Sequence, residues 1–264
     1  HALLMLFRCA FLVIYSGQLG NAGAEDVAEA LWLGARISLK TAAFLVGFPF
    51  VFGTIPYALW KKWPAGGIRK ILGSVAVGLM TLLFMVRIPY YEIFHQGFNI
   101  MLFNGMKDDR MAIWQTAVQQ YQLWPRLFGA LALMAFFIWG LIKFLETPVY
   151  YPRHHVRILD MAAVVMVPVF AVFCRFGGAF HSDSGVPWES AARTQYTVLN
   201  EAVLDDGQAM YRAYHTHARA TQRAMRPISD GELYEAIAAL GGNPDAGTPI
   251  TAFERRTTAA PTRS

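Results

Sequence analysis

The chain has 264 residues, of which 55% are hydrophobic and only 16% are charged. A soluble domain carries about 25% charged residues, so this composition favours burial in lipid over a water-soluble fold. The net charge of +5 does not indicate a nucleic-acid partner, because the basic residues are spread over short loops and form no dense patch.

Five apolar stretches predict an all-α membrane fold with five transmembrane helices: 2–16, 37–60, 71–88, 126–145 and 158–178. Most of these stretches approach the ~20 residues that a helix needs to cross a bilayer. We expect Pro49 and Pro168 to kink their helices, because proline has no amide hydrogen to donate. Cys9 and Cys174 both fall inside apolar stretches, which argues against a disulfide framework. The transmembrane domain is predicted to cover 1–180.

The first apolar stretch begins directly at His1, without a basic flank or the cleavage site of a signal peptide. We therefore interpret the sequence as a piece of a longer chain whose N-terminus lies upstream.

The charges of the loops predict how the chain crosses the membrane. The loop 61–70 carries four basic residues and no acidic one, and the loop 143–157 is also mainly basic. The first loop instead contains Glu25, Asp26 and Glu29. Because basic loops stay in the cytoplasm, we expect a cytoplasmic N-terminus and an extracytoplasmic C-terminus.

The loop 89–125 is long for a simple connection and is predicted to lie on the outer side. It contains the apolar run 98–104, which is too short to span a membrane, and then Asp108 and Asp109. Apolar residues recur at helical spacing in 113–121, and one of the two aspartates would cap that helix. We therefore predict an interfacial or re-entrant element in this loop.

A helical segment, 181–242, is predicted to follow the fifth span on the extracytoplasmic side. Within it, 188–225 has the apolar periodicity of one or two amphipathic helices. The residues 229–232 open a further short helix that ends at Gly241-Gly242. Pro, Gly, Thr and Ala dominate in 243–264, which is the composition of a linker, here toward a missing domain.

Several basic residues lie within or beside the predicted spans, where a charge costs roughly 2.5–3.5 kcal/mol at the bilayer centre. Arg8 lies in the first span, where it either has a function or extends to the cytoplasmic edge. Arg36 and Lys40 share a face of the second span, and Arg87 and Arg175 lie at the outer ends of theirs. Ordinary interfacial anchoring is the alternative to a headgroup-binding role. The candidate lipid-headgroup residues are Arg36, Lys40, Arg87, Arg175, Asp108 and Asp109.

The sequence contains no motif of a catalytic centre, such as G-x-S-x-G, a Walker loop or H-E-x-x-H. No carboxylate or cysteine cluster accompanies His154 and His155, and His215 and His217 cannot share a helix face at a spacing of two. The sequence therefore predicts no catalytic residue, metal ligand or cofactor within this chain.

Three stretches resemble the membrane domain of the lipoteichoic acid synthase family, the sulfatase-type phosphoglycerol or phosphoethanolamine transferases. They are 34–40 (GARISLK), 89–94 (PYYEIF) with the continuation through Phe103-Asn104 to Asp108-Asp109, and 199–206 (LNEAVLDD). The family often has a G-x-R-x-D pattern at the second span. Arg36 matches that pattern, and Ser38 stands at the position of its aspartate.

The resemblance implies that the full-length protein continues into an extracytoplasmic catalytic domain of alkaline-phosphatase fold. In that domain a metal-bound Thr or Ser takes a phospho-headgroup from a membrane lipid and passes it to a glycan or lipid acceptor. The divalent metal (Mn, Mg or Zn) and all catalytic residues belong to that domain, whether it acts as a transferase or as a sulfatase-like hydrolase. The present chain would anchor it in the bacterial plasma membrane, with membrane lipids and the catalytic domain as its partners.

Two other readings stay open. The chain could be a membrane transporter, although it shows no internal repeat and no pair of broken helices. It could also be a membrane anchor or sensor without an enzymatic partner domain.

Overall fold

The computed structural model describes residues 1–105, 111, 115, 118–119, 122–147, 156–181, 186, 191–223, 229–243 and 253. Within these residues every regular element is a helix, as the sequence predicts. The chain divides into two compact units, His1–His217 and Ala218–Ser264. The helices are α1 (Ala2–Ile14), η1 (Ser16–Gln18), α2 (Ala24–Pro49), η2 (Phe50–Thr54), α3 (Ile55–Leu59), α4 (Ala65–Phe94), α5 (Ile100–Gly105), α7 (Leu123–Glu146), α8 (Val156–Arg175), α9 (Thr197–Val203), α10 (Asp206–Arg223) and α11 (Asp230–Ala239).

Among the described residues, three helices are long and apolar enough to cross a membrane: the continuous helix Ala24–Leu59, then α4, then α7. They correspond to the second, third and fourth predicted spans. The first and fifth predicted spans coincide with shorter apolar helices, Ala2–Ile14 and Val164–Arg175. Of the five predicted spans, the structure therefore supports three by length and composition.

The helix that matches the second predicted span begins earlier than predicted, at Ala24 instead of position 37. Glu25 and Asp26 lie in its first turn, and the Asp26 carboxylate accepts a hydrogen bond of 2.9 Å from the Gly23 amide. Negative charge is favourable at this end of a helix, because the first amides there lack backbone partners. The acidic residues that we assigned to a loop therefore start the helix.

Pro49 interrupts this helix without ending it. A π-helical turn, η2, follows the proline directly, and α3 then continues the helix to Leu59. A proline inside a helix removes one amide donor and crowds the preceding turn, and a π turn absorbs this disturbance. The predicted irregularity at Pro49 is thus present as a local change in helix type.

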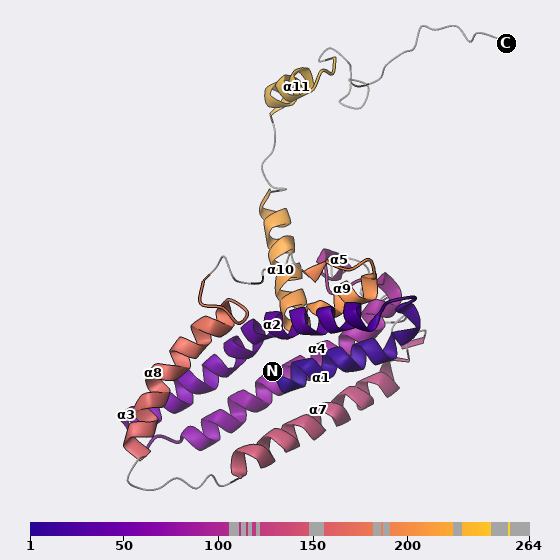
Figure 1. Cartoon of the computed structure of the whole chain (residues 1–264). Coiled ribbons are helices and arrows are strands. Elements are labelled where there is room, and N and C mark those ends of the chain that lie inside the picture. Colours follow the sequence, from indigo (N-terminus) through magenta and orange to yellow (C-terminus); the bar gives the residue numbers. More distant parts are fainter. Residues whose placement is uncertain are drawn as a thin grey trace, which may run out of the picture. The chain divides into compact units, whose positions relative to one another are not determined.

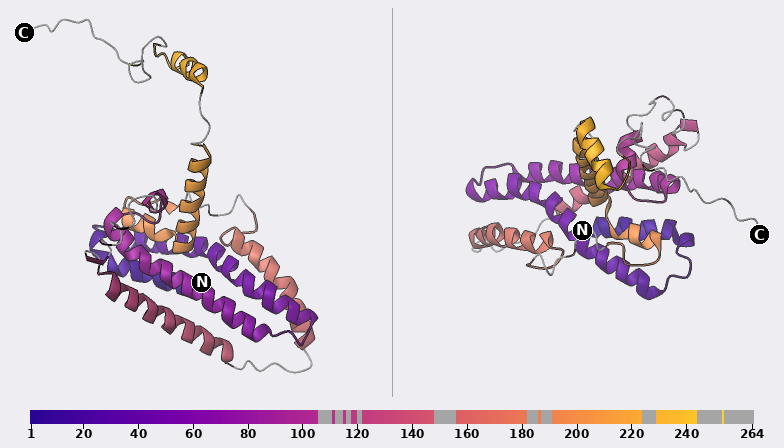
Figure 2. Two further views of the ribbon diagram at one scale, coloured as in Figure 1. Left: turned by 180° about the vertical axis from the view of Figure 1, so that it is seen from behind. Right: turned by 90° about the horizontal axis from the view of Figure 1, so that it is seen from above.

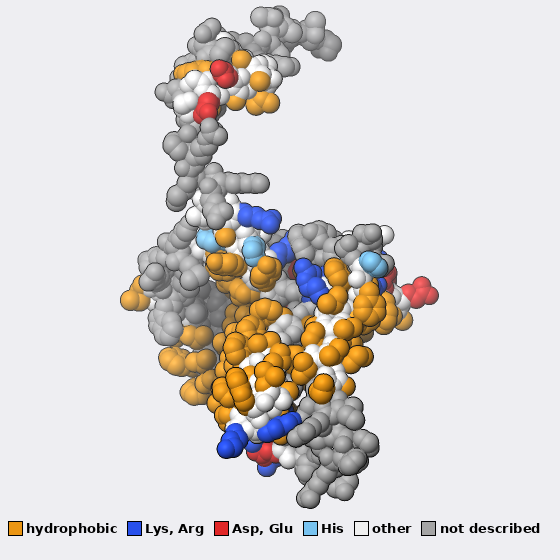
Figure 3. All heavy atoms as spheres, turned by 90° about the vertical axis from the view of Figure 1, so that its left-hand side faces the viewer, with side chains coloured by type: hydrophobic (Ala, Val, Ile, Leu, Met, Phe, Trp, Pro, Cys, Tyr) orange, Lys and Arg blue, Asp and Glu red, His pale blue; other side chains and the backbone are white. Residues whose placement is uncertain are grey.

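The first unit is a bundle in which α4 and α7 run side by side (Figure 1). α2 passes along α1, α4 and α8, and α9 packs across α1 and α2 (Figures 1 and 2). Figure 3 shows hydrophobic side chains gathered in a broad band over one side of the molecule, with Lys and Arg side chains at its lower end. Large apolar side chains exposed on α2, α7 and α8 agree with a surface that faces lipid.

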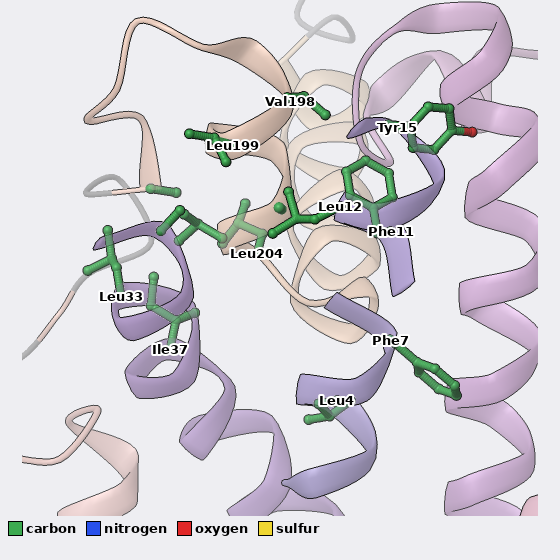
Figure 4. Close-up of a cluster of buried hydrophobic side chains, with 14 of the residues drawn as sticks. Leu4, Phe7, Phe11, Leu12, Tyr15, Leu33, Ile37, Val198, Leu199 and Leu204 are labelled. Carbon is green, nitrogen blue, oxygen red and sulfur yellow. The ribbon is translucent and has the colours of Figure 1, made fainter. Parts of the chain in front are cut away.

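The main core lies where α1, α2, α4 and α9 meet, and Figure 4 shows part of it. Phe11 and Ile37 are completely buried there, as is Leu199 of α9. The rings of Phe7 and Phe84 stack with their centroids 4.5 Å apart. Because α9 supplies central members of this core, it belongs to the same packed unit as the membrane helices and does not form part of a separate domain.

A smaller cluster joins the segment after α4 to the base of α10. Tyr90 and Phe98 are buried against Ala209 and Ala213 of α10. We expected the run 98–104 to lie as an interfacial or re-entrant element. In the structure, its first residue packs on protein, because the small alanines of α10 leave room for a ring. Asp108 and Asp109 lie outside the described residues.

In the second unit, α11 has the bounds that its sequence predicts. The Ser229 hydroxyl accepts a bond of 3.4 Å from the Glu232 amide, and the Glu232 carboxylate accepts one of 3.2 Å from the Ser229 amide. This reciprocal pair satisfies two amides that a helix start otherwise leaves without partners. Gly241 follows the last turn with a φ of 75°, a conformation that glycine adopts without strain.

Gly34 provides a sharp test of this packing. A Cβ atom at this position would lie 2.4 Å from Nε of Arg8, so Gly34→Ala displaces the buried guanidinium from its partners. We expect a loss of about 1–3 kcal/mol of stability, the usual cost of overpacking. The measurement is the thermal midpoint of the detergent-solubilised protein.

Gly47→Ala in the same helix is the matched control, because a Cβ atom there has no neighbour within 4 Å. Its midpoint should stay at or slightly above that of the parent protein. Equal thermal midpoints for the two variants would contradict the close packing of the Arg8 guanidinium against Gly34.

Candidate functional site

Arg8 of α1 is buried and donates to groups from two other helices. Its Nε donates to the carbonyl oxygen of Ala202 at 2.8 Å, and its Nη2 to that of Val203 at 3.0 Å. Nη2 also donates to the Ser38 hydroxyl of α2 at 2.7 Å. The side chain does not extend to a membrane edge, because only 3% of it is exposed. The structure therefore argues against the interpretation that Arg8 extends to the cytoplasmic edge of the membrane.

Arg87 of α4 approaches the same end of α9 from another side. Its Nη2 donates to the carbonyl oxygen of Glu201 at 2.6 Å, and its Nη1 to that of Leu204 at 3.3 Å. Nη1 also forms a buried ion pair of 2.8 Å with the Asp206 carboxylate. The guanidinium carbon lies 4.1 Å from the centre of the Phe11 ring, a favourable position for a cation.

Together, the two arginines satisfy four consecutive carbonyl oxygens at the C-terminal end of α9. The last four carbonyls of any helix have no partner within the helix, and this end carries partial negative charge. A buried guanidinium group can donate hydrogen bonds to these carbonyls and can balance the partial negative charge, since it has five donors and a permanent positive charge. We call this arrangement the α9 clamp: Arg8 and Arg87 with the carbonyls of 201–204.

The start of α10 is fixed by a second set of bonds beside the α9 clamp. The Asp205 carboxylate accepts from the Gln208 amide at 3.1 Å and so caps the first turn of the helix. It also accepts from the Thr41 hydroxyl of α2 at 2.9 Å. The Gln208 side-chain amide donates to the carbonyl oxygen of Ile37 at 2.7 Å. α10 is therefore attached to α2 through its first turn.

Burial and charge act in opposite directions on Asp206. Removal from water raises the pKa of its carboxyl above the ordinary value, and the neighbouring Arg87 guanidinium partly offsets this rise. The ion pair is thus formed at the cost of desolvating both charges, and each partner depends on the other.

Of the predicted headgroup residues that the structure describes, Arg87 has partners different from those of Arg36 and Lys40. Arg36 donates through Nε to the carbonyl oxygen of Gly177 at 2.8 Å, and Lys40 through Nζ to that of Val186 at 2.6 Å. Both therefore bind the segment that follows α8, where Arg175 ends the helix with an exposed side chain. Arg87 lies apart from them in the α9 clamp. A role of these cations in binding lipid stays a prediction.

Sequence reasoning did not identify several members of the site. Asp205, Asp206, Thr41 and Gln208 were not singled out as functional, and Arg8 had no predicted partner. One available signal was the pair of acids directly after a buried apolar segment, because buried carboxylates require partners. Nothing in the local sequence identifies which partners these are.

The interactions of the site hold α1, α2, α4, α9 and α10 together. Among the residues that the structure describes, no group of three His, Cys, Asp or Glu side chains is placed to hold a metal ion. The other hydrogen-bonding groups of the site contact one another or backbone carbonyls, whereas Nε of Arg87 is buried without a hydrogen-bond partner among the described residues. The arrangement fixes how the chain leaves the membrane helices after α8.

The three apolar helices suggest an α-helical membrane protein, and its helices α9 and α10 start within or beside the buried core of the first unit. Comparisons with protein-family models, with curated proteins and with solved structures found no match.

The ion pair of the α9 clamp can be tested by a double-mutant cycle. Arg87→Met and Asp206→Asn each leave one buried group without its partner, and each should cost about 3–5 kcal/mol of stability. We expect the double variant to lose clearly less than the sum of the two. The measurement is the free energy of unfolding in mixed detergent micelles.

The exposed pair Arg126–Glu92 is the control, because it has a similar N–O distance of 3.0 Å but both side chains are about 40% exposed (40%/39%). Arg126→Met and Glu92→Gln should each cost about 0–1 kcal/mol. The interpretation of the α9 clamp fails if the buried and exposed pairs give equal losses.

Proposed function

We propose that this chain is the membrane domain of a transferase similar to the lipoteichoic acid synthases. In this proposal its helices cross the bacterial plasma membrane five times and anchor an extracytoplasmic, metal-dependent catalytic domain. That domain moves a phospho-headgroup from a membrane lipid to a glycan or lipid acceptor.

One observation carries the proposal. Two of the stretches on which the family resemblance depends, 34–40 and 199–206, lie far apart in the sequence and meet in the α9 clamp. Ser38 and the carbonyl oxygen of Ala202 accept hydrogen bonds from the same guanidinium group, that of Arg8. One residue from each of these stretches therefore contacts the Arg8 guanidinium beside α9.

An anchor of this kind has to hold the segment that leads from the membrane helices to the catalytic domain in a fixed position. A catalytic domain that takes headgroups from lipids has to stay near the membrane surface, and the height of its attachment sets its reach. The α9 clamp and the Asp205–Thr41 bond hold the start of α10 against the membrane helices. This supports a role in holding a domain that follows α10.

The predicted topology is tested by labelling single cysteines in intact cells, in a chain whose Cys9 and Cys174 are replaced by alanine. We expect a membrane-impermeant maleimide to label Glu235→Cys, an exposed position of α11. Lys62→Cys, an exposed position in the basic loop 61–70, should react only after the membrane is opened. The opposite labelling pattern would reverse the orientation, and labelling of both positions in intact cells would rule out the proposed crossing between them.

The activity is tested on the product of the complete gene, reconstituted in vesicles that contain phosphatidylglycerol or phosphatidylethanolamine. We expect release of diacylglycerol that requires a divalent metal, is abolished by a chelator and returns when Mn²⁺ is added. A reading frame that stops near Ser264 would overturn the transferase proposal. Absence of metal-dependent headgroup release from the folded full-length protein would do the same.

A further inference from the structure

Three aromatic rings form an exposed surface on α10, on the side turned away from its buried alanines. Tyr211 is 65% exposed and Tyr214 is 56% exposed. The ring of His215 contacts both, with its centroid 4.4 Å from that of Tyr211 and 6.0 Å from that of Tyr214. We call this set of Tyr211, Tyr214 and His215 the α10 ring surface. The Tyr214 ring also has its centroid 6.1 Å from that of Phe103 of α5.

The packing of α10 places this surface at a definite level of the bundle. Ala209 and Ala213, which lie one helical turn apart on the opposite side of α10, are buried against Tyr90. Tyr90 is near the C-terminal end of the candidate membrane span Ala65–Phe94. The α10 ring surface is therefore level with the end of an apolar span, where a bilayer changes from hydrocarbon to headgroups.

The chemistry of the surface fits this level. Tyr and His side chains have an apolar body and a polar tip, and such rings settle among headgroups. Asp206 is the only acidic residue of α10, and its charge is buried against Arg87. The exposed side of the helix therefore carries no carboxylate to repel phosphate, and its Arg212 adds a positive charge.

We propose that the α10 ring surface docks onto the phospholipid headgroups of the leaflet at which α10 emerges. The phenol and imidazole groups hydrogen-bond to phosphate and glycerol oxygens, while the ring faces displace water from the upper acyl chains. This contact fixes the height of α10 above the hydrocarbon. It requires α4 to span the membrane and does not depend on transferase activity.

The test measures depth by spin labelling in vesicles of phosphatidylethanolamine and phosphatidylglycerol. The reporter is Thr216→Cys, an exposed position on α10 that leaves all three rings in place, in the chain without Cys9 and Cys174. Collision with oxygen, which concentrates in lipid, is compared with collision with a water-soluble nickel chelate. Glu235→Cys serves as the water reference, and Phe136→Cys, which is exposed on the spanning helix α7, as the lipid reference.

We expect the reporter to give an oxygen-to-nickel ratio between the two references. Replacing Tyr211 and Tyr214 by alanine should shift that ratio toward the water reference, with the thermal midpoint of the protein unchanged. A ratio equal to the water reference before any ring is removed would overturn the proposal. So would a reporter that neither reagent reaches, because the surface would then be covered by protein, such as a following domain or a second copy of the chain.

These outcomes are independent of the transferase proposal. A protein without headgroup transfer can still give an intermediate ratio, and an active transferase can give the ratio of the water reference.

Discussion

The structure depends on the pairing of two buried guanidinium groups with the free carbonyl end of a short helix. An arginine at membrane depth is costly on its own, and so is a helix end without hydrogen-bond partners. Arg8 and Arg87 offset both costs, because their donors are directed at the four carbonyls that α9 leaves free. Neither partner is stable at this depth without the other. α9 therefore has to fold together with α1 and α4, although Arg8 and Ala202 are 194 positions apart in the sequence.

This coupling explains which parts of the fold could be predicted from the sequence. Apolar runs predict the spanning helices, because lipid imposes the same requirement on every residue of a span. The start of α11 is also local, since Ser229 and Glu232 satisfy each other's amides. The partner of Arg8 is not local, because any carbonyl or hydroxyl at the right depth could accept its hydrogen bonds. The early start of α2 was predictable, since Glu25 and Asp26 are typical first-turn residues, but the same acids also suit a loop.

The four outer cations show a similar limit. Their position along the spans predicts their depth, and on that ground they were candidate lipid-headgroup residues. In the structure Arg36 and Lys40 donate to carbonyls after α8, whereas Arg87 joins the α9 clamp. The sequence gives the position of a charge along a helix axis, but the side on which its partner lies depends on how the helices pack. Cations at similar positions along their helices can therefore serve separate structural tasks, as Arg36 and Arg87 do.

The same interactions restrict how the chain can leave the membrane. The Asp205 cap and the Asp206–Arg87 pair fix the first turn of α10, while Ala209 and Ala213 fix its next turns against Tyr90. A helix held over two turns has little freedom to tilt at its base, so the level of Tyr211 and Tyr214 follows from contacts made deeper in the bundle. Any attachment of these rings to headgroups then adds to an orientation that the α9 clamp already sets. The buried arginines thereby act on the orientation of α10.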